Sequence, residues 1–304
     1  NHRSRPPTVR IMELQTDELT LHYEDDGDPE APPILVLHGI TQSTATWSWL
    51  VPHLAADHRV VRLDFRGHGG SGRTPGAYTF PGYLADATAV CEQVLGRPAV
   101  LIGHSLGGAT SAALAQARPE LVRGVVLEDP AIMELPTSGS GASEGASEGS
   151  QAEGGAMFTT FRLIREVIPG IQASGPSPSD LANGLRLAPS PSGPPFEEVL
   201  HDDALEAMAI ALLQLDVSVL DAIFDGSISP VFDPHRELPV PGIVLAGDPA
   251  RPDTVVRARE LALLEAHSPL VERRIVSGAG HLIHDSRLHR EAVLDATHDL
   301  LPRL

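Results

Sequence analysis

Short apolar segments alternate with helical segments along the first 130 residues, and this alternation limits the folds available to the chain. The apolar segments read as buried strands and cover residues 20–23, 34–37, 60–63, 99–102 and 124–127. The segments between them, such as residues 81–95 and 106–117, have the apolar spacing of helices. We therefore predict an α/β fold, with a mostly parallel sheet flanked by helices on both faces.

A low-complexity segment, residues 137–156, interrupts the alternation. Its Gly, Ser, Ala and Glu residues cannot form a buried core. Helical segments follow, notably residues 158–167 and 204–224, before strands and helices alternate again from residue 239 to the end. We predict one α/β core, residues 1–132 and 235–304, with a mainly helical insertion at residues 133–234, after the sixth core strand.

Charge and composition exclude several classes of function. The net charge of −18 argues against nucleic acid as a partner. All 22 basic residues are arginine, so no mechanism that needs a lysine is available, such as a Schiff base or a Ser–Lys dyad. No apolar run reaches the ~18 residues of a membrane helix. The single cysteine, Cys91, has helical apolar spacing and is expected in the core.

We expect a cytoplasmic protein with a small-molecule substrate and no membrane partner. A homo-oligomer remains open. The sequence starts at Asn1 rather than at a methionine, so a preceding signal peptide remains open too.

Residues 103–107 place a lone serine at the junction of a predicted strand and a predicted helix, in the pattern Gly-His-Ser-Leu-Gly. This G-x-S-x-G pattern is typical of a turn so tight that side chains two residues away would collide. The turn exposes the hydroxyl of Ser105. The next amide, that of Leu106, begins a helix and favours a negatively charged oxygen. We predict Ser105 as a nucleophile and Leu106 as an oxyanion-hole donor.

A nucleophilic serine needs a base, which an acid holds in place. His281 follows the last predicted strand within "SGAGHLIHD" and is the predicted base, with His284 as its rival. The acid remains open. Asp129 and Asp248 each follow a predicted strand and should reach the carboxyl edge of the sheet, and Asp253 is a weaker third choice.

A second oxyanion donor is predicted in the segment "LVLHGIT", residues 35–41. The amide of Ile40 follows an early strand and can join that of Leu106 around a developing oxyanion. We expect His38 to fix this loop by hydrogen bonding rather than to act as an acid or base.

Two other motifs imitate cofactor or metal sites. Gly67, Gly69 and Gly72 form G-x-G-x-x-G, but the prolines that follow oppose the helix that a dinucleotide site requires. The chain has 14 histidines without H-E-x-x-H or another metal-ligand spacing. We read His284 and Asp285 as residues of a helix start. No cofactor and no metal is predicted.

Four segments in this order resemble the α/β-hydrolase superfamily in its serine esterase and lactonase branch. They are "LHGIT", "LDFRGHGGSG", "GHSLGG" and "GAGHLIH", and the resemblance covers nearly all of the chain outside the insertion. It implies a catalytic triad, an oxyanion hole, no cofactor, and a cap domain formed by the insertion over the site. Most members carry the acid as G-x-x-D after the strand that ends here at Ala246, but this chain has Ala250 at that position.

Zearalenone-type lactonases take the acid from the end of the preceding strand, and this similarity favours Asp129 over Asp248. The resemblance implies a serine hydrolase of carboxylic esters, most simply a lactonase for a hydrophobic, zearalenone-like macrolactone. A general carboxylesterase, a carbon–carbon bond hydrolase and a receptor without turnover remain alternatives. An apolar roof is predicted from the cap residues Met157, Phe158, Phe161, Leu163, Ile164, Met208, Ile210, Leu213, Val217 and Phe224.

Overall fold

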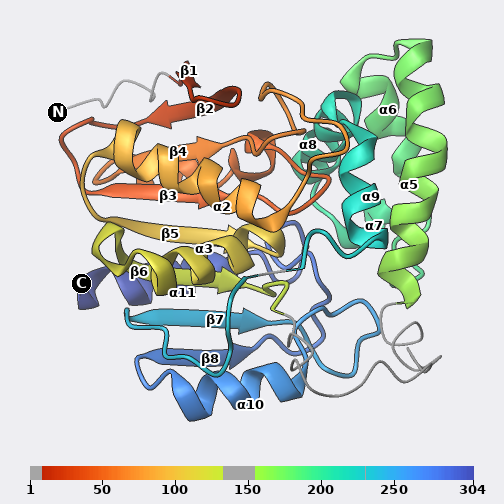
Figure 1. Cartoon of the computed structure of the whole chain (residues 1–304). Coiled ribbons are helices and arrows are strands. Elements are labelled where there is room, and N and C mark those ends of the chain that lie inside the picture. The colour runs from red at the N-terminus through yellow and green to blue at the C-terminus, as the bar shows by residue number, and fades with distance from the viewer. Residues whose placement is uncertain (1–8, 133–154, 230) are drawn as a thin grey trace, which may run out of the picture.

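The computed structural model describes residues 9–132, 155–229 and 231–304, and these form one eight-stranded sheet with helices on both faces (Figure 1). The strand order is β1-β2-β4-β3-β5-β6-β7-β8. β1–β2 and β2–β4 are antiparallel, and all the other pairs are parallel. The strands are β1 Arg10–Gln15, β2 Thr20–Asp26, β3 Pro33–Leu37, β4 Arg59–Leu63, β5 Ala99–His104, β6 Val122–Glu128, β7 Gly242–Ala246 and β8 Val271–Ile275. The predicted α/β sheet is confirmed, with β1 as an edge strand that the sequence analysis missed.

Alternate residues of each central strand face opposite sides of the sheet. Leu35 and Leu37 of β3 belong to one buried cluster, whereas Ile34 and Val36 belong to another. The first cluster lies under α2 (Phe80–Ala89), α3 (Leu106–Ala117) and α10 (Ala258–His267). The second lies under α1 (Val51–Leu54) and α11 (Glu291–Leu300). Cys91 is buried in the first cluster, in the π-helix Val90–Leu95 that directly follows α2.

A helical segment, here called the cap, lies between β6 and β7. Its helices are α5 (Gly155–Ser174), α6 (Pro178–Leu185), α7 (Phe196–Val199), α8 (Asp202–Gln214), η4 (Val217–Leu220) and α9 (Asp221–Phe224). Residues 137–154 of the low-complexity segment lie outside the described residues. The exact domain boundaries therefore remain a prediction.

The prediction of continuous helix over residues 204–224 was wrong. Leu215 has an extended conformation and ends α8, and the side chain of Asp216 then accepts the amide hydrogen of Ser218 at the start of η4. The hydroxyl of Tyr78 in the core donates to Asp216 over 2.6 Å. Asp216 therefore serves as a helix cap and fastens the cap to the core, which the apolar periodicity could not indicate.

None of the described helices is by itself long and apolar enough to cross a membrane, and one bent pair, Asp202–Gln214 with Val217–Phe224, has the length and composition to do so.

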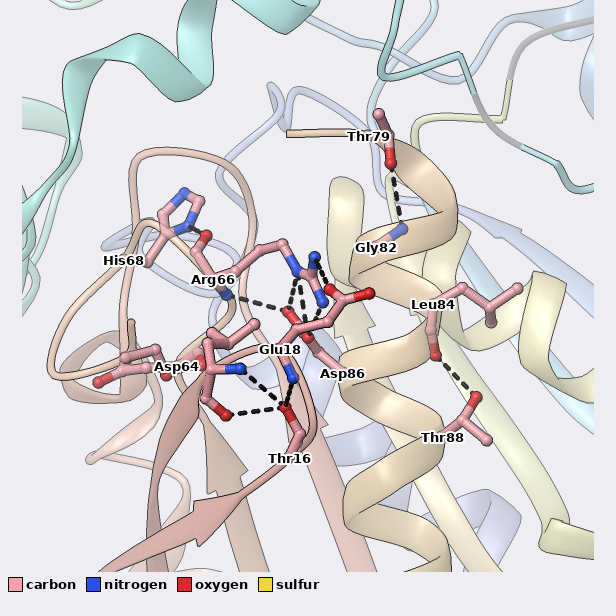
Figure 2. Close-up of polar contacts among 12 residues, drawn as sticks. Thr16, Glu18, Asp64, Arg66, His68, Thr79, Gly82, Leu84, Asp86 and Thr88 are labelled. Carbon is pink, nitrogen blue, oxygen red and sulfur yellow. Dashed lines mark hydrogen bonds and ion pairs between the residues drawn. The ribbon is translucent and has the colours of Figure 1, made fainter. Parts of the chain in front are cut away.

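The glycine-rich loop after β4 is held by ionic contacts rather than built around a helix N-terminus. Figure 2 shows Arg66 between Glu18 and Asp86, with Nη1 2.8 Å from Glu18 and Nη2 2.7 Å from Asp86. The Asp64 carboxylate accepts the amide hydrogen of Gly70 over 2.9 Å. In residues 67–80, all of which the structure describes, helix begins only at Phe80. The loop therefore lacks the helix start that would hold a pyrophosphate.

The carboxyl ends of β3, β5, β6 and β7 meet at the edge of the sheet that faces the cap (Figure 1). Loops that follow parallel strands are therefore brought together there, although they lie far apart in the sequence. The predicted triad and oxyanion residues lie on these loops, on the loop after β8, or, for Leu106, at the first residue of α3.

Candidate active site

Ser105 lies at a strained turn between β5 and α3. Its φ of 51° and ψ of −112° fall in a backbone region that residues other than glycine rarely adopt. A Cβ at Gly103 would come within 3.0 Å of the Gly107 carbonyl oxygen, and one at Gly107 would approach the Leu37 carbonyl oxygen as closely. The two glycines are thus required by backbone crowding, as predicted. The turn presents Ser105, only 7% exposed, to a cavity.

His281 and Asp129 are brought together at this cavity. His281 Nδ1 lies 2.6 Å from Asp129 Oδ2, and both side chains are buried. The Asp129 carboxylate also accepts amide hydrogens from Gly247, Val255 and Val256 in the loop after β7, over 2.9–3.3 Å. These donors stabilise the ionised carboxylate and fix its orientation. His281 lines the same cavity as Ser105.

Asp248 and Asp253, the other two candidates for the acid, have different partners. The Asp248 carboxylate accepts the amide hydrogens of Gly278 and Ala250, over 2.7 and 2.9 Å, and these bonds lower its pKa. Asp253 pairs with Arg251 at 3.1 Å. Asp248 therefore braces the loop before His281, and it is Asp129 that contacts the imidazole.

The loop after β3 places Ile40 at the cavity wall. Gln42 Oε1 accepts the amide hydrogen of Gly39 over 2.8 Å, and Thr41 has a φ of 70°. Ile40 lines the cavity, and among the described residues no acceptor is found for its amide hydrogen. Leu106 is the first residue of α3, so its amide has no acceptor within the helix. Both amides can therefore donate to an oxygen beside Ser105.

His38 has the contacts expected of a loop-fixing residue. Nδ1 lies 2.7 Å from the Gly39 carbonyl oxygen, and Nε2 accepts the amide hydrogen of Phe65 over 3.1 Å. Complete burial lowers the pKa of His38. A neutral ring with its proton on Nδ1 satisfies both bonds, and it joins the loops after β3 and β4.

The cavity of about 370 Å³ lies between Ser105 and the cap. Its walls are mainly apolar, and α5 contributes Met157, Phe161, Leu163, Ile164, Val167, Ile168 and Ile171. Five of the ten predicted roof residues line it: Met157, Phe161, Leu163, Ile164 and Met208. The other five are not among the lining residues: Phe158, Ile210, Leu213, Val217 and Phe224.

A buried cluster beneath the cavity was missed by the sequence analysis. Glu128 and His284 are both fully buried, and His284 Nδ1 lies 2.7 Å from Glu128 Oε1. His284 and Asp285 are not residues of a helix start, because α11 begins only at Glu291. The available signal was the position of Glu128 immediately before Asp129, at the end of a buried strand.

Protonation of His284 follows from its two carboxylate neighbours. Burial alone would lower the pKa of His284, but Asp285 and Glu128 raise it to about 10. His104, Glu128 and His284 have potential ligand atoms within 4.8 Å of one another. Both ring nitrogens of His284 already have partners, Glu128 at Nδ1 and Gln42 and Asp285 at Nε2, so this set fits a hydrogen-bonded network better than a metal centre.

Comparisons with known proteins identify relatives that share this fold. A family model described as the alpha/beta hydrolase fold matches residues 32–151. A serine hydrolase-like protein of Danio rerio is 40% identical over 105 residues, 34% of this chain and 32% of that protein. The 2-(acetamidomethylene)succinate hydrolase of Mesorhizobium japonicum is 25% identical over 267 residues, 88% of this chain and 87% of that protein.

The solved structure of the enol-lactonase from Burkholderia xenovorans has a TM-score of 0.67 at 18% identity, covering 96% of this chain and 100% of the other. The chain matches only about a third of the length of the Danio rerio relative. The structural likeness extends the shared fold over nearly the whole chain.

Proposed function

The chain belongs to the α/β-hydrolase superfamily, and on that premise we propose that it is a serine hydrolase of carboxylic esters. Ser105 is the proposed nucleophile, His281 the base and Asp129 the acid. The observation that carries this proposal is the 2.6 Å contact between His281 and Asp129 at the cavity that Ser105 also lines. A hydrolase that uses serine in this way needs these three groups and two oxyanion donors.

In the proposed reaction, the Ser105 hydroxyl oxygen attacks the ester carbonyl carbon while its proton passes to His281 Nε2. Asp129 holds Nδ1–H and stabilises the imidazolium that forms. The amides of Ile40 and Leu106 donate to the tetrahedral oxyanion. As the intermediate collapses, His281 protonates the leaving alcohol oxygen. A water then repeats these steps on the acyl-enzyme and releases the acid.

A neutral, hydrophobic lactone is the proposed substrate. The apolar walls of the cavity support a hydrophobic substrate. Arg251 is the arginine among the described lining residues, and its pairing with Asp253 at 3.1 Å disfavours capture of a substrate carboxylate. The enol-lactonase of Burkholderia xenovorans shares the fold, so this scaffold accommodates lactone hydrolysis.

Among such lactones we propose a zearalenone-like macrolactone, because zearalenone-type lactonases carry the acid at the position that Asp129 occupies here. A cytoplasmic location also remains a prediction.

Product analysis tests the proposal. The purified protein is incubated with linear esters and with lactones, zearalenone included, and the products are weighed, with Ser105→Ala as the blank. One product heavier than a lactone by one water, absent from the blank, supports the lactonase. Cleavage of linear esters alone would indicate a general carboxylesterase. Absence of turnover on the whole panel would contradict an ester hydrolase and favour a carbon–carbon bond hydrolase or a receptor.

A further inference from the structure

We infer that Glu128 and His284 form a second acid–histidine pair that positions Asp129 and His281 for catalysis. This inference rests on the proposed function, because it assigns a purpose to the neighbours of the proposed acid and base. Glu128 and His284 are positioning residues, since neither is among the residues that line the cavity.

The two pairs connect the same two segments of the chain. Glu128 is the last residue of β6 and immediately precedes Asp129, while His284 follows His281 by three residues. Glu128 Oε1 accepts the backbone amide hydrogen of His284 over 2.9 Å, and both Glu128 oxygens lie within 2.9 Å of His284 Nδ1. The loop that carries the base is therefore fastened to the strand end that carries the acid at two successive positions.

Asp129 needs this support because its backbone is strained. Its φ of 34° is unusual for a residue other than glycine, because the Cβ then crowds the backbone. Residues in such a conformation persist when their surroundings hold them from several sides. Glu128 holds the chain on one side of Asp129, and the amides of the loop after β7 hold its carboxylate on the other.

The second pair also contacts the other two loops of the site. The ring of His104, the residue before Ser105, lies 4.5 Å from the ring of His281 and 4.6 Å from that of His284. Gln42 Oε1 lies 2.9 Å from His104 Nδ1 and accepts the Gly39 amide hydrogen in the oxyanion loop. A shift of His284 would therefore displace His104 and, through it, the nucleophile, the base and the oxyanion loop.

Charge gives this arrangement a measurable signature. His284 lies between two carboxylates, with Glu128 2.7 Å from its Nδ1 and Asp285 3.3 Å from its Nε2, and these carboxylates raise its pKa to about 10; the Gln42 amide nitrogen also lies 3.1 Å from Nε2. Because this cluster lies beside the loop of His281, changing one of its charges should change the electrostatic potential at the His281 imidazole. Asp129 and the ring of His104 contact His281 itself. The titratable groups beside its loop are Asp253, which lies against Gly280, Glu128, which contacts His284, and His284 and Asp285 of the same loop.

Charge and position can be separated by three variants. Glu128→Gln removes a negative charge, so the pH midpoint of the His281 titration should fall. His284→Asn removes a positive charge, so the midpoint should rise. Glu128→Asp keeps the charge but shortens the side chain, so the midpoint should change least. In all three, kcat for ester hydrolysis should fall about 10- to 100-fold with KM nearly unchanged, as for other residues that orient a reacting group.

The His281 titration is followed by NMR of the full-length protein with labelled histidine, and kcat and KM are measured beside it. Asp86→Asn is the control, because it breaks the buried Arg66–Asp86 pair outside the cavity. It should lower the melting temperature and leave both readouts as in the wild type.

Opposite shifts of the midpoint in Glu128→Gln and His284→Asn, with the loss of kcat, would support the second pair. Lowered melting temperatures with unchanged kcat and unchanged midpoints would overturn it and leave a purely structural ion pair. The NMR titration needs no substrate. If the wild type hydrolyses no ester, the proposed function fails, while opposite midpoint shifts would still support the coupling of the two pairs.

Discussion

His281 Nδ1 lies 2.6 Å from the carboxylate of Asp129, a residue 152 positions earlier in the chain. Parallel strands make this meeting possible, because β6 and the loop after β8 deliver their side chains to the same edge of the sheet. The Asp248 carboxylate is occupied by the amides of Gly278 and Ala250. The contact therefore favours Asp129 as the acid over Asp248 and Asp253, the other carboxylates that the sequence left open.

Substitution of each carboxylate by its amide tests this difference. Asp129→Asn should lower kcat by about 10⁴-fold, because an amide neither fixes the His281 tautomer nor stabilises the imidazolium. Asp248→Asn should retain most of the activity, since the Asp248 carboxylate bonds to the amides of Gly278 and Ala250 and not to the imidazole. Steady-state kinetics on one ester measures both. Equal losses in the two variants would show that the acid has been assigned wrongly.

The glycines around Ser105 should resist substitution. Gly103→Ala places a Cβ against the Gly107 carbonyl oxygen, and we expect it to destabilise the fold by about 3 kcal/mol, at the upper end of overpacking effects. Gly184→Ala is the matched control, because a Cβ there meets nothing within 4 Å and α6 is a helix. Thermal unfolding compares them, and similar melting temperatures would refute the crowding argument.

Acidification should remove the contribution of Asp64 to the free energy of unfolding. Burial raises the pKa of Asp64, but bonds from His22 and the amides of Gly70 and Thr44 lower it to about 2, below its ordinary 3.8. A depressed folded pKa stabilises the fold above about pH 4, and this contribution is lost as the pH falls towards 2. It amounts to about 2 kcal/mol. Urea unfolding from pH 5 to pH 2 should show a steeper loss for the wild type than for Asp64→Asn; parallel curves would contradict it.

The apolar wall on α5 should set the affinity for a hydrophobic substrate. Ile164→Asn places an amide in this wall, and we expect KM for a hydrophobic ester to rise about 10-fold, with a smaller change in kcat. Glu166→Asn on the same helix is exposed and does not line the cavity, so it should match the wild type. An unchanged KM for Ile164→Asn would show that the substrate does not contact α5.

Local patterns were sufficient to predict the sheet apart from its edge strand β1, and to predict the positions of Ser105 and His281. A tight strand–helix turn imposes glycines at fixed spacing, so the turn around Ser105 can be read from five letters. The Asp129–His281 contact and the Glu128–His284 pair depend instead on how two distant loops meet, which no single segment encodes. The interruption of the helical segment at Asp216 depends on Tyr78, a residue of the core.

The role of Ser105 is tested most directly by covalent labelling. The protein is treated with a fluorophosphonate, which reacts with an activated serine, and its intact mass is measured beside that of Ser105→Ala. We expect one adduct on the wild type, mapped to the peptide that contains Ser105, and none on the variant. An unlabelled wild type, or an adduct that persists in Ser105→Ala, would contradict it.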